Sequence, residues 1–152
     1  MSSKLVLFVC TGNVCRSPMA EYLLRKHLNG SSGWTVGSAG TCAPEKQPPT
    51  PAAVSAMAER GVDISGHRSR QLTRELVEKA RVIVAMTAAH AQTIGLLYPG
   101  ALEKTFVLGS FDAAGGDDIE DPIGLPEDAY RRARDKIERA MPGLAAFLKS
   151  LE

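Results

Sequence analysis

Four short apolar runs alternate with segments of helical periodicity, and this alternation limits the possible folds more than any other feature of the chain. The runs occupy residues 4–9, 34–39, 81–86 and 105–108. Their short length and β-branched content indicate strands. Strands that alternate with helices form a parallel sheet whose connections cover both faces. We therefore predict a single three-layer α/β domain over residues 1–152, with a four-stranded parallel sheet and helices on both faces.

Serine or threonine precedes four of the expected helices and indicates where they begin. Ser17-Pro18 and Thr50-Pro51 each combine an N-cap residue with a proline suited to the first helical position. The helix after Ser17 should extend to about residue 28, and Gly61 should end the helix after Thr50. Thr73 and Thr87 are expected to cap helices that reach about residues 79 and 97.

The C-terminal segment carries apolar residues at helical spacing, namely Tyr130, Ala133, Ile137, Met141, Leu144 and Leu148. Pro142-Gly143 is expected to kink or break this helix near its end. Two stretches rich in turn-forming residues, 40–49 and 109–126, are expected to be loops. The second loop also carries a cluster of acidic residues.

Charge and cysteine content restrict the class of protein. The formal net charge is +1, which gives no electrostatic case for nucleic acid or an anionic membrane as a partner. No apolar run approaches the ~20 residues that span a bilayer, and the first run is too short for a secretory signal. Three cysteines do not suggest a disulfide framework, so we expect a cytoplasmic protein. Three scattered histidines match no metal-ligand spacing, and we expect no metal site.

The segment between the first strand and the first helix has the composition of a phosphate loop. It reads Cys10-Thr11-Gly12-Asn13-Val14-Cys15-Arg16-Ser17. A loop bent in this position directs backbone N–H groups at an anion, and the start of the helix adds its positive dipole end. Arg16 can hold two phosphate oxygens at once, and the same field stabilises a thiolate at Cys10. Gly12 leaves room for the backbone to approach the oxygens.

These residues resemble a known family. The stretch VCTGNVCRSPMAE, residues 9–21, is similar to the signature of the low-molecular-weight protein tyrosine phosphatases, a family that includes bacterial protein arginine phosphatases. Asp121-Pro122 matches the family's downstream Asp-Pro pair, and the resemblance covers essentially the whole chain. It implies a flavodoxin-like fold of the phosphotyrosine phosphatase I type. It also implies hydrolysis of phosphomonoesters without a metal or other cofactor.

The resemblance implies a role for each of three residues. Cys10 would attack phosphorus, Arg16 would stabilise the transition state, and Asp121 would protonate the leaving group and then activate water. The residues alone do not favour Asp121 over its neighbours Asp117 and Asp118, so this assignment rests on the resemblance. Other loop residues would contact the substrate, namely Thr11, Gly12, Asn13, Val14, Cys15 and Ser17.

Supporting roles are implied for further residues. Asn13 and Ser17 resemble positions that shape the loop and hydrogen-bond the thiolate, and Ser38 and His67 resemble residues that brace it. Without the resemblance, Ser38 is an ordinary serine at a strand end and His67 an ordinary loop histidine. Cys15 would pair with Cys10 under oxidation, or would be a passive small side chain under the loop.

The expected partners are phosphorylated proteins, with inorganic phosphate or another oxyanion as product or inhibitor. Tyrosine-directed members of the family have Ile before the second cysteine and arginine-directed members have Thr, whereas this chain has Val14. An apolar side chain suits a phenyl ring better than a guanidinium, which favours phosphotyrosine over phosphoarginine. Ile123 departs from the pattern, because tyrosine-directed members usually have an aromatic residue there to stack on the substrate ring.

Two other classes of protein share part of this pattern. Arsenate reductases have a similar loop but need downstream cysteines for a disulfide relay, and no cysteine follows Cys42. Flavin carriers have a similar Thr-Gly-Asn loop, but they have no use for Cys10 with Arg16 and need aromatic residues around the flavin. Both readings remain remote alternatives to a phosphatase.

Overall fold

The computed structural model describes residues 4–30 and 33–152. Its four strands form a parallel sheet with the order β2-β1-β3-β4, which confirms the predicted fold class. The strands are β1 (Leu5–Cys10), β2 (Thr35–Gly40), β3 (Val82–Ala85) and β4 (Thr105–Val107). The chain places β2 on one side of β1 and β3 on the other. The carboxyl end of β1 therefore lies at the switch point where ligands bind in sheets of this kind.

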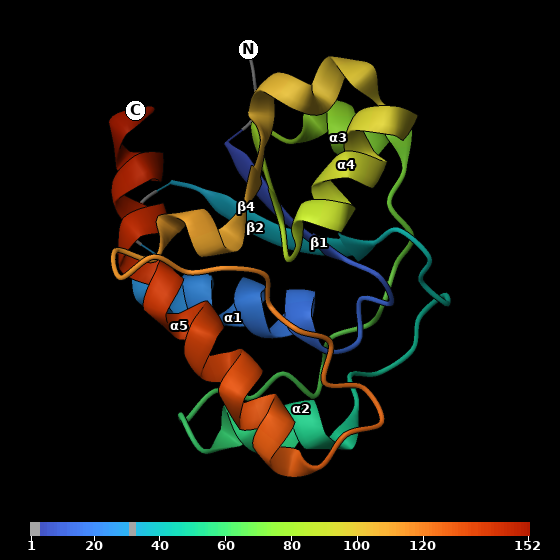
Figure 1. Cartoon of the computed structure of the whole chain (residues 1–152), viewed down its shortest axis with the longest axis vertical. Helices are drawn as coiled ribbons and strands as arrows, with labels where there is room; N and C mark the ends of the chain where they lie inside the picture. The colour runs from blue at the N-terminus through green and yellow to red at the C-terminus, as the bar shows by residue number, and fades with distance from the viewer. Residues whose placement is uncertain (1–3, 31–32) are drawn as a thin grey trace.

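Helices cover both faces of the sheet (Figure 1). The α-helices are α1 (Arg16–Leu28), α2 (Pro51–Ala58), α3 (Arg74–Lys79), α4 (Ala88–Leu97) and α5 (Glu127–Ser150). Two short 3₁₀ helices, η1 (Pro99–Lys104) and η2 (Leu108–Phe111), flank β4. Helices α1 and α5 lie on one face and α3 and α4 on the other, while α2 lies beyond α5 and away from the sheet.

Strand β1 is buried on both faces, because its alternate side chains enter two separate apolar cores. Val6 and Phe8 belong to the core under α1 and α5, whereas Leu7 and Val9 belong to the core under α3 and α4. None of these four side chains is accessible to solvent. Burial of each large apolar side chain contributes about 1.5–3 kcal/mol. The strand that ends at Cys10 is thus a rigid base for the loop that follows it.

Two of the four expected helix caps are confirmed, a third is confirmed in position only, and one is wrong. The side chains of Thr73 and Thr87 accept hydrogen bonds from the first turns of α3 and α4. Thr50 is the N-cap residue of α2 and Pro51 its first residue, but the side chain of Thr50 makes no capping hydrogen bond. Helix α1 begins at Arg16, two residues earlier than expected, and Ser17 does not cap it. Both of these hydroxyls are instead directed at cysteines of the phosphate loop.

Helix α5 runs unbroken through Pro142, so the expected break is wrong. Proline removes one hydrogen bond of the helix, but the apolar stripe on both sides of it stays buried in the core. Gly143 also packs closely on η2, where an added Cβ would lie 2.1 Å from the carbonyl oxygen of Phe111. Tertiary packing therefore holds the helix together across the proline.

The two expected loops are confirmed, except that η2 occupies the start of the second one. In this second loop Ile119 is almost completely buried and anchors the segment that leads to Asp121. Among the described residues, no helix combines the length and the apolar character needed to cross a bilayer.

Candidate active site

The first two carbonyl groups of the phosphate loop are hydrogen-bonded to the segment that follows β2. The carbonyl oxygens of Cys10 and Thr11 accept hydrogen bonds from the amides of Thr41 and Cys42, at 2.9 and 3.0 Å. Asn13 has a φ of 56°, a left-handed conformation that reverses the direction of the chain. With its carbonyls bound on the β2 side, the loop is free to present N–H groups to its centre, as an anion nest requires.

Asn13 is fully buried and holds the loop to three other segments. Its Nδ2 donates to the hydroxyls of Ser17 and Ser38, at 2.8 and 2.9 Å. Its Oδ1 accepts from the backbone amide of Arg70 at 3.0 Å, and its carbonyl oxygen lies 2.9 Å from Nε2 of His67. Ser38 and His67 thus contact the loop through a single asparagine.

The sulfur of Cys10 lies at the base of this loop and is almost inaccessible. It is 2.9 Å from the hydroxyl of Ser17 and accepts a hydrogen bond from the amide of Asn13 at 3.3 Å. Both groups can donate to a thiolate, and the N-terminus of α1 adds a favourable dipole. These contacts hold the Cys10 sulfur in place as a nucleophile.

Arg16 connects the phosphate loop to the loop that carries Asp121. Its buried guanidinium donates from Nη1 to the carbonyl oxygen of Ile119 at 3.0 Å, while Nη2 lies 3.6 Å from Oδ2 of Asp121. Asp121 is about half exposed, and its Oδ1 accepts from the amide of Ile123 at 3.1 Å. The guanidinium that is expected to hold a phosphate therefore has an acid beside it.

The neighbouring acids are engaged elsewhere. Asp117 forms an ion pair with Lys136 at 2.5 Å, and this hydrogen bond lowers the pKa of Asp117. Asp118 accepts a hydrogen bond from the amide of Ala88 at the start of α4, at 2.9 Å. Of Asp117, Asp118 and Asp121, it is Asp121 that lies beside Arg16. The sequence pattern alone does not distinguish Asp121 from the other two.

Comparison with known proteins agrees with this geometry. The family model described as low molecular weight phosphotyrosine protein phosphatase matches residues 5–152. The chain belongs to this family.

Relatives of two kinds are similar to the chain. A protein-arginine-phosphatase of Geobacillus stearothermophilus is 42% identical, over 95% of this chain and 96% of that protein. A probable low molecular weight protein-tyrosine-phosphatase, EpsP of Ralstonia nicotianae, is 40% identical over 97% and 98%. Among solved structures, a cysteine-to-serine mutant of the YwlE arginine phosphatase with a phosphorylated active site serine has a TM-score of 0.89. It is 37% identical, and the match covers 95% of each chain.

Cys15, the second cysteine of the family signature, lies below the loop. Its sulfur is 3.5 Å from the hydroxyl of Thr50 and 3.8 Å from that of Tyr130, and burial raises the pKa of the Cys15 thiol. Cys10, Cys15 and Cys42 are all free thiols. Cys15 thus lies in surroundings that favour the neutral thiol.

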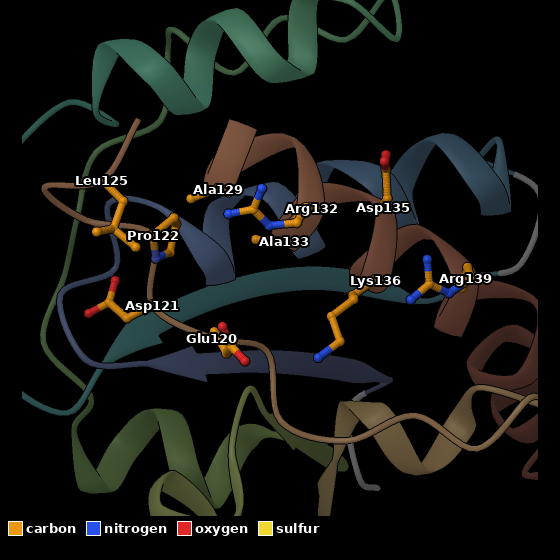
Figure 2. A pocket seen from close by; sticks show the side chains of 10 residues that line it. All are labelled: Glu120, Asp121, Pro122, Leu125, Ala129, Arg132, Ala133, Asp135, Lys136 and Arg139. Atoms are coloured by element: carbon orange, nitrogen blue, oxygen red, sulfur yellow. The ribbon is translucent and has the colours of Figure 1, made fainter. Parts of the chain in front are cut away.

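A groove of about 430 Å³ begins at Asp121 and follows α5 (Figure 2). Its lining comes from the Asp-Pro loop and from one face of α5, and comprises Glu120, Asp121, Pro122, Leu125, Ala129, Arg132, Ala133, Asp135, Lys136 and Arg139. Ile123 and Leu125 on this loop are each 54% exposed. The loop that carries Asp121 therefore presents aliphatic side chains to solvent, consistent with the absence of an aromatic residue after Asp121-Pro122.

Sequence reasoning missed two buried ionisable groups next to the loop. Glu21 on α1 accepts a hydrogen bond from the hydroxyl of Ser38 at 2.5 Å, and its Oε1 lies 3.9 Å from Nδ1 of His67. Burial lowers the pKa of His67, which favours the neutral ring. His90 on α4 lies 2.8 Å from the hydroxyl of Thr11. In the sequence, His90 comes three residues after Thr87, a capping threonine that follows a strand. This position was the signal that could have identified His90 as a residue near the phosphate loop.

No group of three or more histidine, cysteine or acidic side chains suited to a metal ion occurs in residues 4–30 and 33–152.

Replacement of Asn13 by alanine should destabilise the protein because it removes buried hydrogen bonds to the hydroxyls of Ser17 and Ser38 and leaves the Arg70 amide without its acceptor. Asn29 has a similar left-handed φ of 52° but lies exposed at the end of α1. Asn13→Ala should therefore lower the free energy of unfolding by about 2 kcal/mol more than Asn29→Ala. Urea unfolding of the two variants measures this difference, and equal losses would contradict the proposed role of the buried hydrogen bonds.

Proposed function

We propose that the protein hydrolyses phosphomonoesters on other proteins, with phosphotyrosine as the favoured substrate, through a phosphocysteine intermediate. The observation that carries the proposal is the arrangement of three groups. The Cys10 sulfur lies at the start of the loop against Ser17, the guanidinium of Arg16 at the end of the loop is buried, and Asp121 lies 3.6 Å from that guanidinium. These are the nucleophile, the phosphate clamp and the acid that such a reaction needs.

In the first step the thiolate of Cys10 attacks phosphorus and forms an S–P bond. Arg16 holds two of the phosphoryl oxygens, while the bond from phosphorus to the leaving oxygen breaks. Asp121, in its protonated form, donates its proton to that oxygen as the phenol departs. The phosphorylated active site serine of the YwlE mutant supports a covalent intermediate at this position of the fold.

In the second step water attacks the phosphocysteine. Asp121, now a carboxylate, accepts a proton from the water, the S–P bond breaks, and inorganic phosphate forms. The hydroxyl of Ser17 and the amide of Asn13 stabilise the thiolate that leaves. The same groups therefore contact the sulfur as the nucleophile of the first step and as the leaving group of the second.

Val14 supports phosphotyrosine as the substrate. Its side chain is partly buried, and it packs against the apolar core. Ile123 and Leu125 add exposed apolar surface beside Asp121. A phenyl ring gains from such contacts, whereas a guanidinium would lose hydrogen bonds to water without replacement.

Phosphoarginine is the second candidate substrate. The arginine phosphatase of G. stearothermophilus is as similar to this chain as the tyrosine phosphatase EpsP is. The chain also lacks the aromatic residue after Asp-Pro that would stack on a phenyl ring. Both substrates would use the same three catalytic groups.

Cys10→Ser should abolish turnover of a small aryl phosphate in the presence of a metal chelator, because serine is a much weaker nucleophile in this site. Cys42→Ser is the matched control, since Cys42 is exposed, and it should retain full activity. Activity that survives in Cys10→Ser would disprove a phosphocysteine mechanism. Release of phosphate measures both variants.

Asp121→Asn should slow hydrolysis of phenyl phosphate by about a hundredfold, because the poor leaving group needs a proton. Hydrolysis of an activated nitrophenyl ester should slow much less. Asp117→Asn is the control, since Asp117 is paired with Lys136, and it should affect neither substrate. Equal slowing of both esters in Asp121→Asn would argue against Asp121 as the general acid.

A kinetic comparison of phosphotyrosine and phosphoarginine peptides tests the substrate class. The unmodified protein should have the larger kcat/KM for phosphotyrosine, and Val14→Ile should keep that order. Val14→Thr should shift the ratio toward phosphoarginine by about tenfold, because it adds a hydroxyl at nearly constant volume. A clear preference of the unmodified protein for phosphoarginine would establish the second candidate instead.

A further inference from the structure

The junction between β3 and α4 is hydrogen-bonded to both halves of the active site. The amide of Met86 donates to the carbonyl of Val9 in β1 at 3.0 Å, and the carbonyl of Met86 accepts from the amide of Ile119 at 2.9 Å. The amide of Ala88 donates to Asp118 at 2.9 Å. This junction is therefore fixed relative to the strand that precedes the phosphate loop and to the segment that precedes Asp121.

His90 extends from this junction to the phosphate loop. The ring is buried, with 8% of the residue exposed. Its Nε2 lies 2.8 Å from the hydroxyl oxygen of Thr11, and its Nδ1 lies 2.9 Å from the hydroxyl oxygen of Thr87. A line of three side chains thus connects the start of α4 to the residue directly after Cys10.

The hydrogen bonds of Thr87 indicate which nitrogen of His90 carries the proton. The hydroxyl oxygen of Thr87 already accepts the backbone N–H of His90 at 3.1 Å. If this hydroxyl donates its own hydrogen to Nδ1, every polar group of the pair has a partner. Nε2 must then carry the proton and donate it to the oxygen of Thr11. The alternative tautomer would leave the hydrogen of Thr87 without a partner among the described residues.

The surroundings of His90 keep its ring neutral. Burial lowers the pKa of His90 to about 4, and the charge of Arg16 acts in the same direction, whereas Asp121 and Asp118 oppose them. At neutral pH, His90 can therefore donate to Thr11 from Nε2 while Nδ1 accepts from Thr87.

We propose that His90 is a positioning residue that orients the hydroxyl of Thr11 as a hydrogen-bond donor to a phosphoryl oxygen of the bound substrate. Because Nε2–H of His90 occupies a lone pair of the Thr11 oxygen, the hydrogen of that hydroxyl points away from the ring. Thr11 is exposed, and its hydroxyl has no second partner among the described residues. The inference rests on the proposed function for the identity of the bound phosphoryl group, but the binding itself requires no turnover.

Binding of inorganic phosphate, measured by calorimetry, tests the proposal independently of catalysis. Thr11→Val removes the hydroxyl at nearly constant shape and should weaken binding about tenfold, since the hydroxyl donates to a charged group. Thr11→Ser keeps the hydroxyl and should restore most of the affinity. His90→Ala should weaken binding to a similar extent as Thr11→Val, and the double variant should bind no more weakly than either single variant.

Two control variants and a measurement of unfolding temperature separate positioning from a general structural effect. His27→Ala changes an exposed histidine of α1 and should leave phosphate binding unchanged. His90→Gln keeps an N–H near the position of Nε2 and should therefore lose less phosphate affinity than His90→Ala. If His90→Ala does not fold, His90→Gln takes its place in the test. A lower unfolding temperature with unchanged phosphate affinity in the His90 variants would overturn the proposal, as would additive losses in the double variant.

If the protein binds phosphate as described but hydrolyses neither phosphotyrosine nor phosphoarginine peptides, the proposed function fails and the role of His90 in phosphate binding stands. If hydrolysis is normal but His90→Ala and His90→Gln bind phosphate as tightly as the unmodified protein, the role of His90 fails and the proposed function stands.

Discussion

The buried side chain of Asn13 is the interaction on which the site depends. A left-handed residue in the middle of the loop costs about 1 kcal/mol or more, and asparagine tolerates this conformation better than most residues do. The amide offsets that cost by bonding Ser17, Ser38 and the backbone of Arg70 at once. Ser17 in turn lies against the sulfur of Cys10. The nucleophile is therefore oriented by contacts that reach across three segments of the chain.

The sheet determines where this loop lies. Strand order places β1 in the interior, and the carboxyl end of β2 then lies directly beside the loop. Gly40 permits that approach, because an added Cβ would lie 2.3 Å from the carbonyl oxygen of Thr11 and 3.1 Å from the amide of Asn13. A side chain at this position would displace the backbone that is expected to bind phosphate.

Local patterns predicted most of the fold, and they failed where distant contacts compete with local ones. The parallel α/β sheet and the caps at Thr73 and Thr87 follow from short-range patterns, and the structure confirms them. Ser17 has the sequence of an N-cap, but its hydroxyl is directed at Cys10. Pro142 has the sequence of a helix break, but tertiary packing outweighs it. His90 was missed for the same reason, since its partner Thr11 is 79 positions away.

The contact between Arg16 and Asp121 has a further consequence for the order of events at the site. The guanidinium is shared between the carbonyl of Ile119 and the carboxylate of Asp121. A phosphoryl dianion that binds Arg16 competes with that carboxylate for the same positive charge. Binding therefore weakens the attraction between Arg16 and Asp121. The substrate's own charge thus helps to release the acid from Arg16 for the first step.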